Sequence, residues 1–361
     1  MTVPELDPTW GGPARRIDLA ALADGAADEP LLDEHGRISE PLLIVDLDAP
    51  GPAGPAASAV ARADRILVGV ASRSAPGGDL RAVLEALDVT LVPAAAEAGP
   101  PTVDTADPWL AAEELHAAAN VHPQAATVLA GLLRRTGTLP VDAALDAESF
   151  AYSTLLGGSE FRTWLDARRP RPAPPPAPAA PVLVDRTFDE LRITLNRPER
   201  RNAYGREVRD ALVAALDVAL FDETVHVVLD GAGPSFCAGG DLDEFGTTPD
   251  PATAHFVRTS GGAGRTLHRL AGRAEARVHG ACVGAGIELP AFTGRVVADP
   301  DATFRLPEVG MGLIPGAGGT VSIPRRIGRW RTLHLALGGA SIPAARALSW
   351  GLVDTVRRHE G

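Results

Sequence analysis

Hydrophobic residues in the first half of the chain form short apolar runs separated by stretches with helical spacing. The apolar runs at 41–48, 65–70 and 89–92 predict buried strands. Helical spacing predicts helices at 56–63, 79–87, 107–136 and 140–168, and the helix at 107 opens with an Asp-Pro cap. Residues 1–40 are polar and aperiodic, so we expect an N-terminal arm.

The second half alternates strands, glycine-rich turns and helices. Two antiparallel strands are predicted at 182–186 and 191–195, and further strands at 225–229, 276–278 and 295–298. Helical segments are predicted at 204–220, at 252–272 and from the turn at 280–286 to about 293. This alternation predicts an α/β fold.

A proline-rich segment separates the two halves. Residues 170–181 read PRPAPPPAPAAP, a composition that favours extended polyproline II and acts as a semi-rigid spacer. We therefore predict a linker at 170–181. It would join an α/β and helical domain at 41–169 to a catalytic domain at 182–361.

Composition narrows the classes of partner. The chain of 361 residues has a net charge of −12, which argues against a general nucleic-acid or membrane-surface binder. All 34 basic residues are arginine, so a bound phosphate would be held by guanidinium or peptide N–H groups.

Cysteine usage and the apolar runs bear on the compartment. Cys237 and Cys282 lie in apolar, small-residue segments, which favours buried thiols in a reducing environment. We see no signal peptide, no membrane-length apolar run and no His/Cys/Asp cluster with metal-ligand spacing. We expect a cytoplasmic protein without a metal site.

Two glycine-rich turns follow predicted strands and precede helices. They read GPSFCAGGDL at 233–242 and HGACVGAGIEL at 279–289. Small residues let backbone N–H groups approach a ligand, and two such amides that converge form an oxyanion hole. Taken alone, each turn is weak evidence, because small-residue turns more often serve only packing.

Six segments in fixed order make a more specific pattern. They read NRPERRNA at 196–203, FCAGGDL at 236–242, GAGIEL at 284–289, FRLPE at 304–308, GLIPGAGGT at 312–320 and AARALSWGLVD at 344–354. Over residues 182–356 this sequence resembles the crotonase (enoyl-CoA hydratase/isomerase) superfamily.

The resemblance implies a repeated ββα spiral fold in a homo-oligomer, either a trimer or a hexamer. It implies an acyl-CoA substrate, with coenzyme A as part of the substrate and no further cofactor. The thioester oxygen would lie between the amides of Gly240 and Ala285, although many relatives have glycine where Ala285 stands. A backbone donor survives that difference.

Two glutamates match positions that carry glutamate in family hydratases. By resemblance, Glu288 would orient and deprotonate water, and Glu308 would deliver the proton to Cα. Two carboxyl groups that flank a pocket supply the base and the acid that hydration requires. In family isomerases the first position is commonly not glutamate.

The coenzyme is expected near the first turn. The resemblance places the adenosine end near the amide of Ala238, with Arg200 and Arg201 near the phosphates and Asp241 beside them. These arginines could equally belong to a solvated turn, and Asp241 could be a helix cap.

The chain departs from the family in the order of its parts. Family members normally continue after the segment that matches 351–354, into helices that close the acyl pocket. Residues 107–169 resemble those helices, and 41–92 resembles a shortened copy of 225–298. We hypothesise that the first half is a degenerate crotonase-like domain whose helices roof the active site. The alternative is an unrelated α/β domain used for oligomerisation.

The leading prediction is an enoyl-CoA hydratase-type lyase. Other crotonase chemistries remain open, including isomerisation, decarboxylation and thioester or C–C hydrolysis, because fold and oxyanion hole do not separate them. A non-catalytic acyl-CoA-binding subunit is the third alternative.

Overall fold

The computed structural model describes residues 12–72, 77–94, 99–168 and 179–358. The chain divides into two compact units, Met1–Arg134 and Arg135–Gly361, and each is described by itself. This division differs from the predicted boundary at the proline-rich segment 170–181, of which only 179–181 are described. Within the described residues, no helix combines the length and apolarity that a membrane span requires.

The first unit is built on a five-stranded parallel sheet whose strands follow chain order. The strands are β1 (Arg16–Asp18), β2 (Leu42–Asp46), β3 (Ile66–Val70), β4 (Val89–Pro93) and β5 (Thr102–Thr105). The helices are α1 (Leu19–Ala23), α2 (Ala53–Arg62), the 3-10 helix η1 (Gly78–Leu80), α3 (Arg81–Ala86) and α4 (Pro108–Val121). The three predicted strands of this half are therefore confirmed.

Two predictions for the first half were wrong. Residues 16–23 are not part of an arm: β1 pairs with β2, and Leu19 and Leu22 are buried. So short a strand carries no periodicity to detect. The single helix expected at 107–136 is two helices, α4 and α5 (Pro123–Thr136). Pro123 lacks an N–H and disfavours the helical conformation at the preceding residue, and His122 accordingly has φ −132° and ψ 66°.

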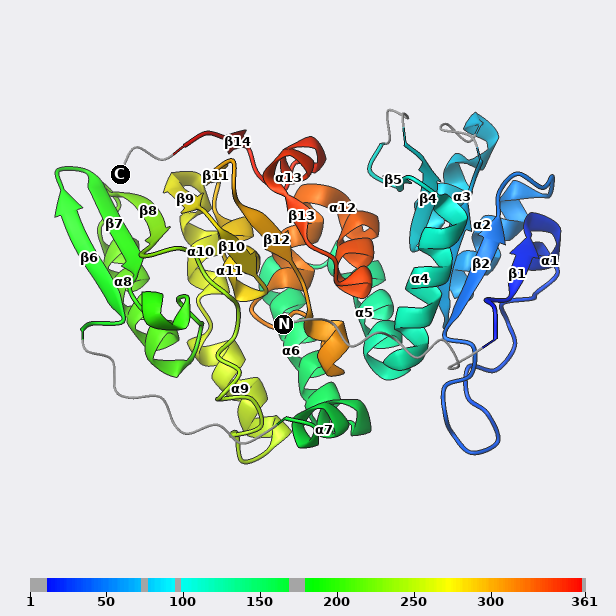
Figure 1. The fold of residues 1–361 in the computed structure, drawn as a ribbon, viewed down its shortest axis with the longest axis horizontal. Coiled ribbons are helices and arrows are strands. Elements are labelled where there is room, and N and C mark those ends of the chain that lie inside the picture. Colours follow the sequence, from blue (N-terminus) through cyan, green and yellow to red (C-terminus); the bar gives the residue numbers. More distant parts are fainter. Residues whose placement is uncertain (1–11, 73–76, 95–98, 169–178, 359–361) are drawn as a thin grey trace. The chain divides into compact units, whose positions relative to one another are not determined.

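The second unit contains two sheets (Figure 1). The six-stranded sheet has the order β14-β11-β9-β8-β7-β6, and the three-stranded sheet has the order β10-β12-β13. The strands are β6 (Val182–Thr187), β7 (Glu190–Leu195), β8 (His226–Gly231), β9 (Ala274–Val278), β10 (Ala281–Val283), β11 (Arg295–Ala298), β12 (Thr303–Arg305), β13 (Ile342–Pro343) and β14 (Thr355–Val356).

From β9 to β12 the strands of the second unit alternate between these two sheets. β9 and β10 are followed by α11 (Ala285–Glu288), and β11 and β12 are followed by α12 (Gly319–Gly338). In each case the first strand joins the large sheet and the second joins the small one. This repetition confirms the predicted ββα arrangement, and the antiparallel pair β6–β7 is also confirmed.

The remaining helices of the second unit range from single 3-10 turns to the 16-residue helix α8. They are η2 (Pro198–Arg200), α8 (Arg206–Phe221), α9 (Pro251–Gly261), α10 (Gly264–Leu270), η3 (Ala271–Arg273), η4 (Pro290–Phe292), η5 (Glu308–Met311) and α13 (Ala344–Trp350). The helical segment expected at 252–272 is therefore interrupted, and so is the one expected up to 293. Helix α8 packs against β6 and β7.

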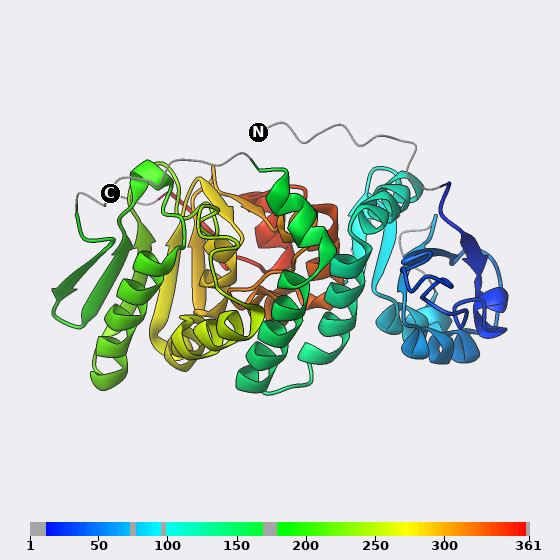
Figure 2. The ribbon, with the colours of Figure 1, turned by 90° about the horizontal axis from the view of Figure 1, so that it is seen from below.

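Two helices that precede the proline-rich segment belong to the second unit. The helix predicted at 140–168 is split at Gly157-Gly158 into α6 (Val141–Leu156) and α7 (Ser159–Asp166). Helix α6 lies beside α9 and also packs against α10 and α12, while α7 packs against η5 (Figures 1 and 2). These contacts explain why 141–166 group with 182–358 rather than with 41–134.

This packing makes a testable prediction about truncation. A fragment starting at residue 182 lacks α6 and α7, so it exposes apolar and carboxylate surface that is buried in the full unit. We expect that fragment to aggregate or to melt well below a fragment starting at residue 135. Purification yield and thermal melting of the two fragments check this, and equal melting temperatures would contradict it.

Candidate active site

The two glycine-rich turns lie side by side in parallel register. Cys237 forms an isolated parallel bridge with Cys282, with hydrogen bonds from the Val283 amide to the Cys237 carbonyl (3.0 Å) and from the Cys237 amide to the Ala281 carbonyl (3.4 Å). Gly240 and Ala285 each lie three residues beyond the paired cysteine (240 − 237 = 3 and 285 − 282 = 3). The register therefore brings the two predicted oxyanion residues to matching positions.

A buried asparagine that sequence reasoning did not single out fixes the first turn. The Asn202 carboxamide accepts from the Arg197 amide at 2.7 Å. Its Nδ2 donates to the carbonyl oxygens of Ala232, Ser235 and Phe236 at 2.9–3.0 Å. Because Asn202 lies within the segment 196–203, the motif itself was the available signal.

Both residues that are predicted to supply oxyanion amides line one cleft. Among the described residues, neither the Gly240 nor the Ala285 amide donates a hydrogen bond to another turn or loop. The cleft has an empty volume of about 900 Å³, and its walls include Gly240, Ala285, Glu288 and Glu308. The structure thus brings together the four residues to which the sequence analysis assigned chemistry.

Because Gly284 has no side chain, it leaves room for the two carboxylates to lie close together. It has φ +51°, which favours glycine, and a Cβ at this position would lie 2.4 Å from Glu308 Oε1 and 3.6 Å from Glu288 Oε1. Glu288 is at the end of α11, and Glu308 begins η5. Both side chains are buried.

The two carboxylates have different hydrogen-bond partners. Glu288 Oε2 accepts from the amides of Ala317 and Gly319, each at 2.8 Å. Glu308 Oε2 is buried, and no described residue offers it a hydrogen bond. Amide donors stabilise a carboxylate, whereas burial without donors favours the neutral acid. Hydrogen bonding by itself therefore favours negative charge on Glu288 and a proton on Glu308, while burial opposes charge on both.

A third buried carboxylate, Glu148 on α6, was missed by the sequence analysis. Its Oε1 accepts from the Gly318 amide at 2.8 Å, and its Oε2 accepts from the Thr320 amide at 2.9 Å and the Thr320 hydroxyl at 2.7 Å. The available signal was helical spacing, because Glu148 falls one turn after the buried Ala144 and shares its face of the helix.

Burial raises the pKa of all three carboxyl groups. For Glu308 the pKa is raised to about 8, chiefly by burial. For Glu288 burial raises the pKa well above its usual value, and the charges of Glu308 and Glu148 raise it further, while the two amides oppose this. Burial also raises the pKa of Glu148, against the opposing effect of its three donors. Because the groups interact, they titrate as one set.

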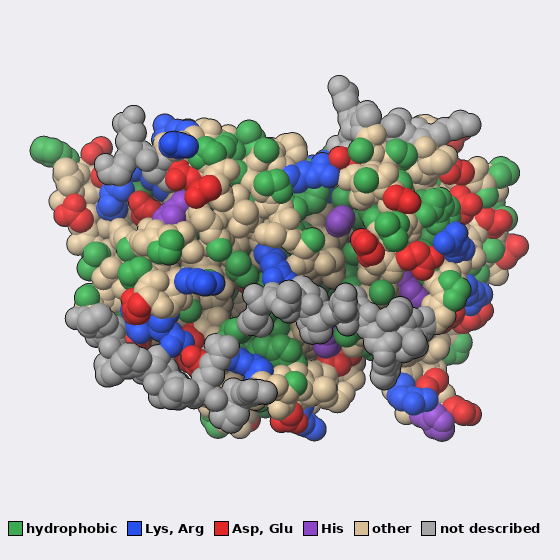
Figure 3. Space-filling view, viewed as in Figure 1, with side chains coloured by type: hydrophobic (Ala, Val, Ile, Leu, Met, Phe, Trp, Pro, Cys, Tyr) green, Lys and Arg blue, Asp and Glu red, His purple; other side chains and the backbone are tan. Residues whose placement is uncertain are grey.

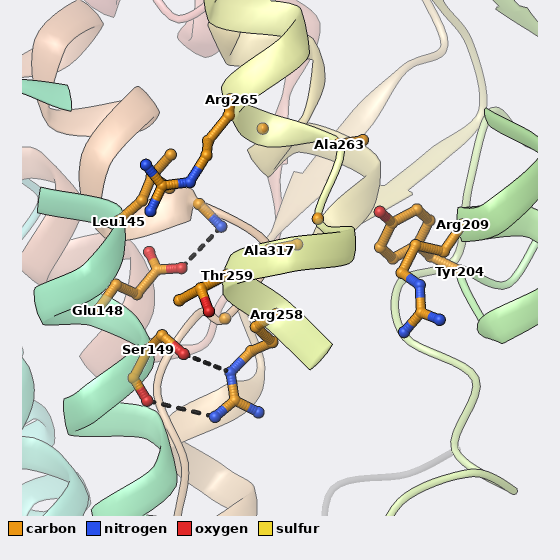
Figure 4. A pocket seen from close by; sticks show the side chains of 14 residues that line it. Leu145, Glu148, Ser149, Tyr204, Arg209, Arg258, Thr259, Ala263, Arg265 and Ala317 are labelled. Carbon is orange, nitrogen blue, oxygen red and sulfur yellow. Dashed lines mark hydrogen bonds between the residues drawn. The ribbon is translucent and has the colours of Figure 1, made fainter. Parts of the chain in front are cut away.

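Figure 4 shows a second cavity that adjoins the cleft, beside Glu148. It has an empty volume of about 520 Å³ and shares Tyr204, Arg209 and Arg258 with the larger cleft. The Arg258 guanidinium donates to the Ser149 carbonyl oxygen at 3.2 Å and lies over the Tyr152 ring. Helix α6 therefore contributes residues to the walls of both hollows.

The residues predicted to bind coenzyme A are only partly placed at the cleft. Asp241 lines it, and Arg200 pairs with Asp241 (2.5 Å) and Asp243 (2.8 Å). The Ala238 amide donates to the Arg201 carbonyl at 2.9 Å, so it cannot offer this N–H to a ligand. That part of the expectation was wrong, because the amide ties the glycine-rich turn to the segment 196–203. The side chain of Arg201 is exposed.

The described residues form no cluster that could hold a metal ion. On the face drawn in Figure 3, arginine and carboxylate side chains are interspersed. In the part of the chain that the structure describes, no group of three or more His, Cys, Asp or Glu side chains is arranged to hold a metal ion.

The amino-acid sequence is similar to known proteins over its second half. The family described as Enoyl-CoA hydratase/isomerase matches residues 191–360. A 2,3-dehydroadipyl-CoA hydratase from Escherichia coli is 37% identical over 176 residues, which is 48% of this chain and 68% of that protein.

Two other relatives are similar at comparable levels. A mevalonyl-coenzyme A hydratase from Aspergillus fumigatus is 34% identical over 47% of this chain and 63% of its own length. A 1,2-epoxyphenylacetyl-CoA isomerase from Escherichia coli is 36% identical over 45% of this chain and 64% of its own length. The chain thus spans about two-thirds of the length of these relatives.

The raised pKa of Glu308 predicts a pH-dependent stability. Its folded-state pKa of about 8 lies above the ordinary 4.5, so its contribution to stability is complete below pH 4.5 and is lost as the pH rises towards 8. The loss is roughly 1.4 kcal/mol per pH unit. Glu308→Gln lacks this ionisation, so the variant should gain stability relative to wild type between pH 5 and pH 8. Urea unfolding across that range measures the difference, and parallel pH curves would contradict the assignment.

Proposed function

Because this chain belongs to the enoyl-CoA hydratase/isomerase family, we propose that its second unit is an acyl-CoA lyase that adds or removes water at an α,β-unsaturated thioester. The observation that carries the proposal is the convergence of the Gly240 and Ala285 amides with Glu288 and Glu308 on one cleft. Water addition involves no net oxidation or reduction, so the proposal requires no cofactor beyond the coenzyme A of the substrate.

In the proposed reaction, the two amides stabilise charge that develops on the thioester oxygen. Glu288 takes a proton from water while the water oxygen forms a bond to Cβ. The π electrons move to give an enolate whose negative oxygen lies between the amides of Gly240 and Ala285. Such preorganised donors contribute ~3–4 kcal/mol each. Glu308 then gives its proton to Cα. The proton that Glu288 took from water returns to Glu308 before the next turnover, and water removal is the reverse sequence.

The unequal hydrogen bonding of the two glutamates supports this division of roles. Ala317 and Gly319 donate to Glu288, which favours the charged form that a base needs. Glu308 Oε2 has no donor among the described residues, which favours the neutral form that an acid needs. An isomerase could use one carboxylate to move a proton, and the similar isomerase keeps that reaction as the second candidate.

Substitution of either glutamate tests the proposal. Glu288→Gln and Glu308→Gln should each reduce crotonyl-CoA hydration by ~10² or more, because each removes a proton-transfer group. The loss of the enoyl-thioester absorbance follows the reaction. Asp142→Asn, on the exposed side of α6, is a matched control and should keep wild-type activity.

The wild-type protein decides between the alternatives. No turnover of crotonyl-CoA by the folded protein would contradict hydration of this substrate, and isomerase, hydrolase and larger acyl substrates would then be tested. If acyl-CoA binding were also undetectable by calorimetry, catalysis on coenzyme A thioesters would be excluded. The homo-oligomeric state and the cytoplasmic location stay predictions.

The pH profile is a second test. The active enzyme must carry a proton on Glu308 and a charge on Glu288, so kcat/KM should be bell-shaped. Its alkaline limb should fall above about pH 8, where Glu308 ionises. Hydration and dehydration should have the same profile, because the equilibrium constant between them does not involve protons. A profile that stays flat up to pH 10 would contradict the role of Glu308.

A further inference from the structure

Four consecutive amides of the segment 317–320 are bound alternately by two buried glutamates. Ala317 and Gly319 donate to Glu288, and Gly318 and Thr320 donate to Glu148. The segment therefore lies between two carboxylates that take its amides from opposite sides. Any shift of the segment away from one carboxylate also changes its distance from the other.

The segment 316–319 reads Gly-Ala-Gly-Gly, and its largest side chain is the methyl group of Ala317. Gly318 has φ +105°, a conformation that other residues rarely adopt. Its position must therefore come from its amides and from the residues that bind them. Glu148 is 3% exposed and provides acceptors for two of the four amides and for the Thr320 hydroxyl.

Helix α6 is itself held in place near Glu148. Arg258 on α9 donates to Ser149 and to the hydroxyl of Ser153, both on α6 (Figure 4 shows the contact with Ser149). The hydroxyl of Ser153 also donates to the Pro251 carbonyl at 2.8 Å. Glu148 is thus a fixed acceptor rather than a side chain on a free helix.

We propose that Glu148 is a positioning residue of the active site: it fixes the segment 317–320 and so keeps the Ala317 and Gly319 amides on Glu288. The proposal rests on the proposed function in that Glu288 is taken as the catalytic base. It assigns a role to a residue outside the region 191–360 that matches the family. The active site of the second unit is then incomplete without α6, which precedes the proline-rich segment.

Loss of Glu148 should displace the segment 317–320 before it unfolds the second unit. Without the carboxylate, two buried amides and one hydroxyl lack their acceptors, which is unfavourable in a dry interior. The glycine-rich segment can move to find other partners, and Glu288 then loses its fixed orientation. A displacement of about 1 Å in a catalytic group can reduce the rate by ~10².

Hydrogen exchange tests the positioning role without any substrate. In Glu148→Ala, the amides of 317–320 should exchange on the order of tenfold faster than in wild type. Glu148→Gln keeps an acceptor for Thr320, so its exchange rates should lie between those of wild type and Glu148→Ala. Asp142→Asn, on the same helix and half-exposed, should exchange like wild type. Mass spectrometry of peptides that cover 316–322 measures these rates.

Steady-state kinetics with crotonyl-CoA is the second readout. Glu148→Ala should reduce kcat by ~10–10² while KM changes less than about threefold, because the oxyanion amides remain in place. Glu148→Gln should restore part of this loss. If the substitution only destabilised the fold, the fraction of folded protein would fall, and kcat per folded molecule would stay the same as in wild type.

Folded Glu148→Ala with wild-type exchange at 317–320 and wild-type kcat overturns the proposal. If that variant does not fold, Glu148→Gln and Thr320→Val replace it, and wild-type exchange and kcat in both overturn it equally. Faster exchange in the variants of a protein that does not hydrate crotonyl-CoA would uphold the positioning role and contradict the proposed function. Failure of the positioning role and failure of the proposed function are therefore distinguishable.

Discussion

The active site depends on one constraint, the need to keep buried carboxylates supplied with hydrogen-bond donors. An isolated carboxylate in a dry interior is strongly unfavourable, and proteins accept it only with compensating donors or with a proton. In the second unit, the peptide amides of 317–320 provide these donors to Glu288 and Glu148. Among the described residues, Glu308 has no donor on Oε2, and burial raises its pKa to about 8.

This constraint requires very close packing of backbone on backbone. Gly286 illustrates it, because a Cβ at this position would lie 2.2 Å from the Cys237 carbonyl oxygen. The same close approach allows the two glycine-rich turns to pair at Cys237 and Cys282, and Gly240 and Ala285 beyond this pair line the same cleft. The geometry of the proposed site and the backbone packing are thus set by the same few residues.

The order of parts along the chain is unusual for such a site. The residues that surround the cleft come from both sides of the proline-rich segment, because α6 contributes Tyr152 and Leu156 to its walls. This agrees with the hypothesis that the helices of the first half roof the site. In both units the parallel strands of the large sheet follow chain order, which is what a shortened repeat would produce. The origin of the first unit as a degenerate copy stays a prediction.

The sequence by itself determined the local and motif-based features. Apolar runs and glycine-rich turns predicted most of the strands of both units, and the ordered motifs identified Gly240, Ala285, Glu288 and Glu308. These signals are available because they lie within short stretches of chain. Breaks such as His122-Pro123 also had a local cause, and a stricter use of the proline rule would have found that one.

Tertiary structure alone decided what completes the site. The partners of Glu148 lie 170 and 172 residues away, so no local pattern shows that its carboxylate meets the amides of Gly318 and Thr320. The grouping of α6 and α7 with the second unit likewise follows from packing rather than from their place before the linker. Sequence periodicity shows which face of a helix is buried, but only the fold shows what that face is buried against.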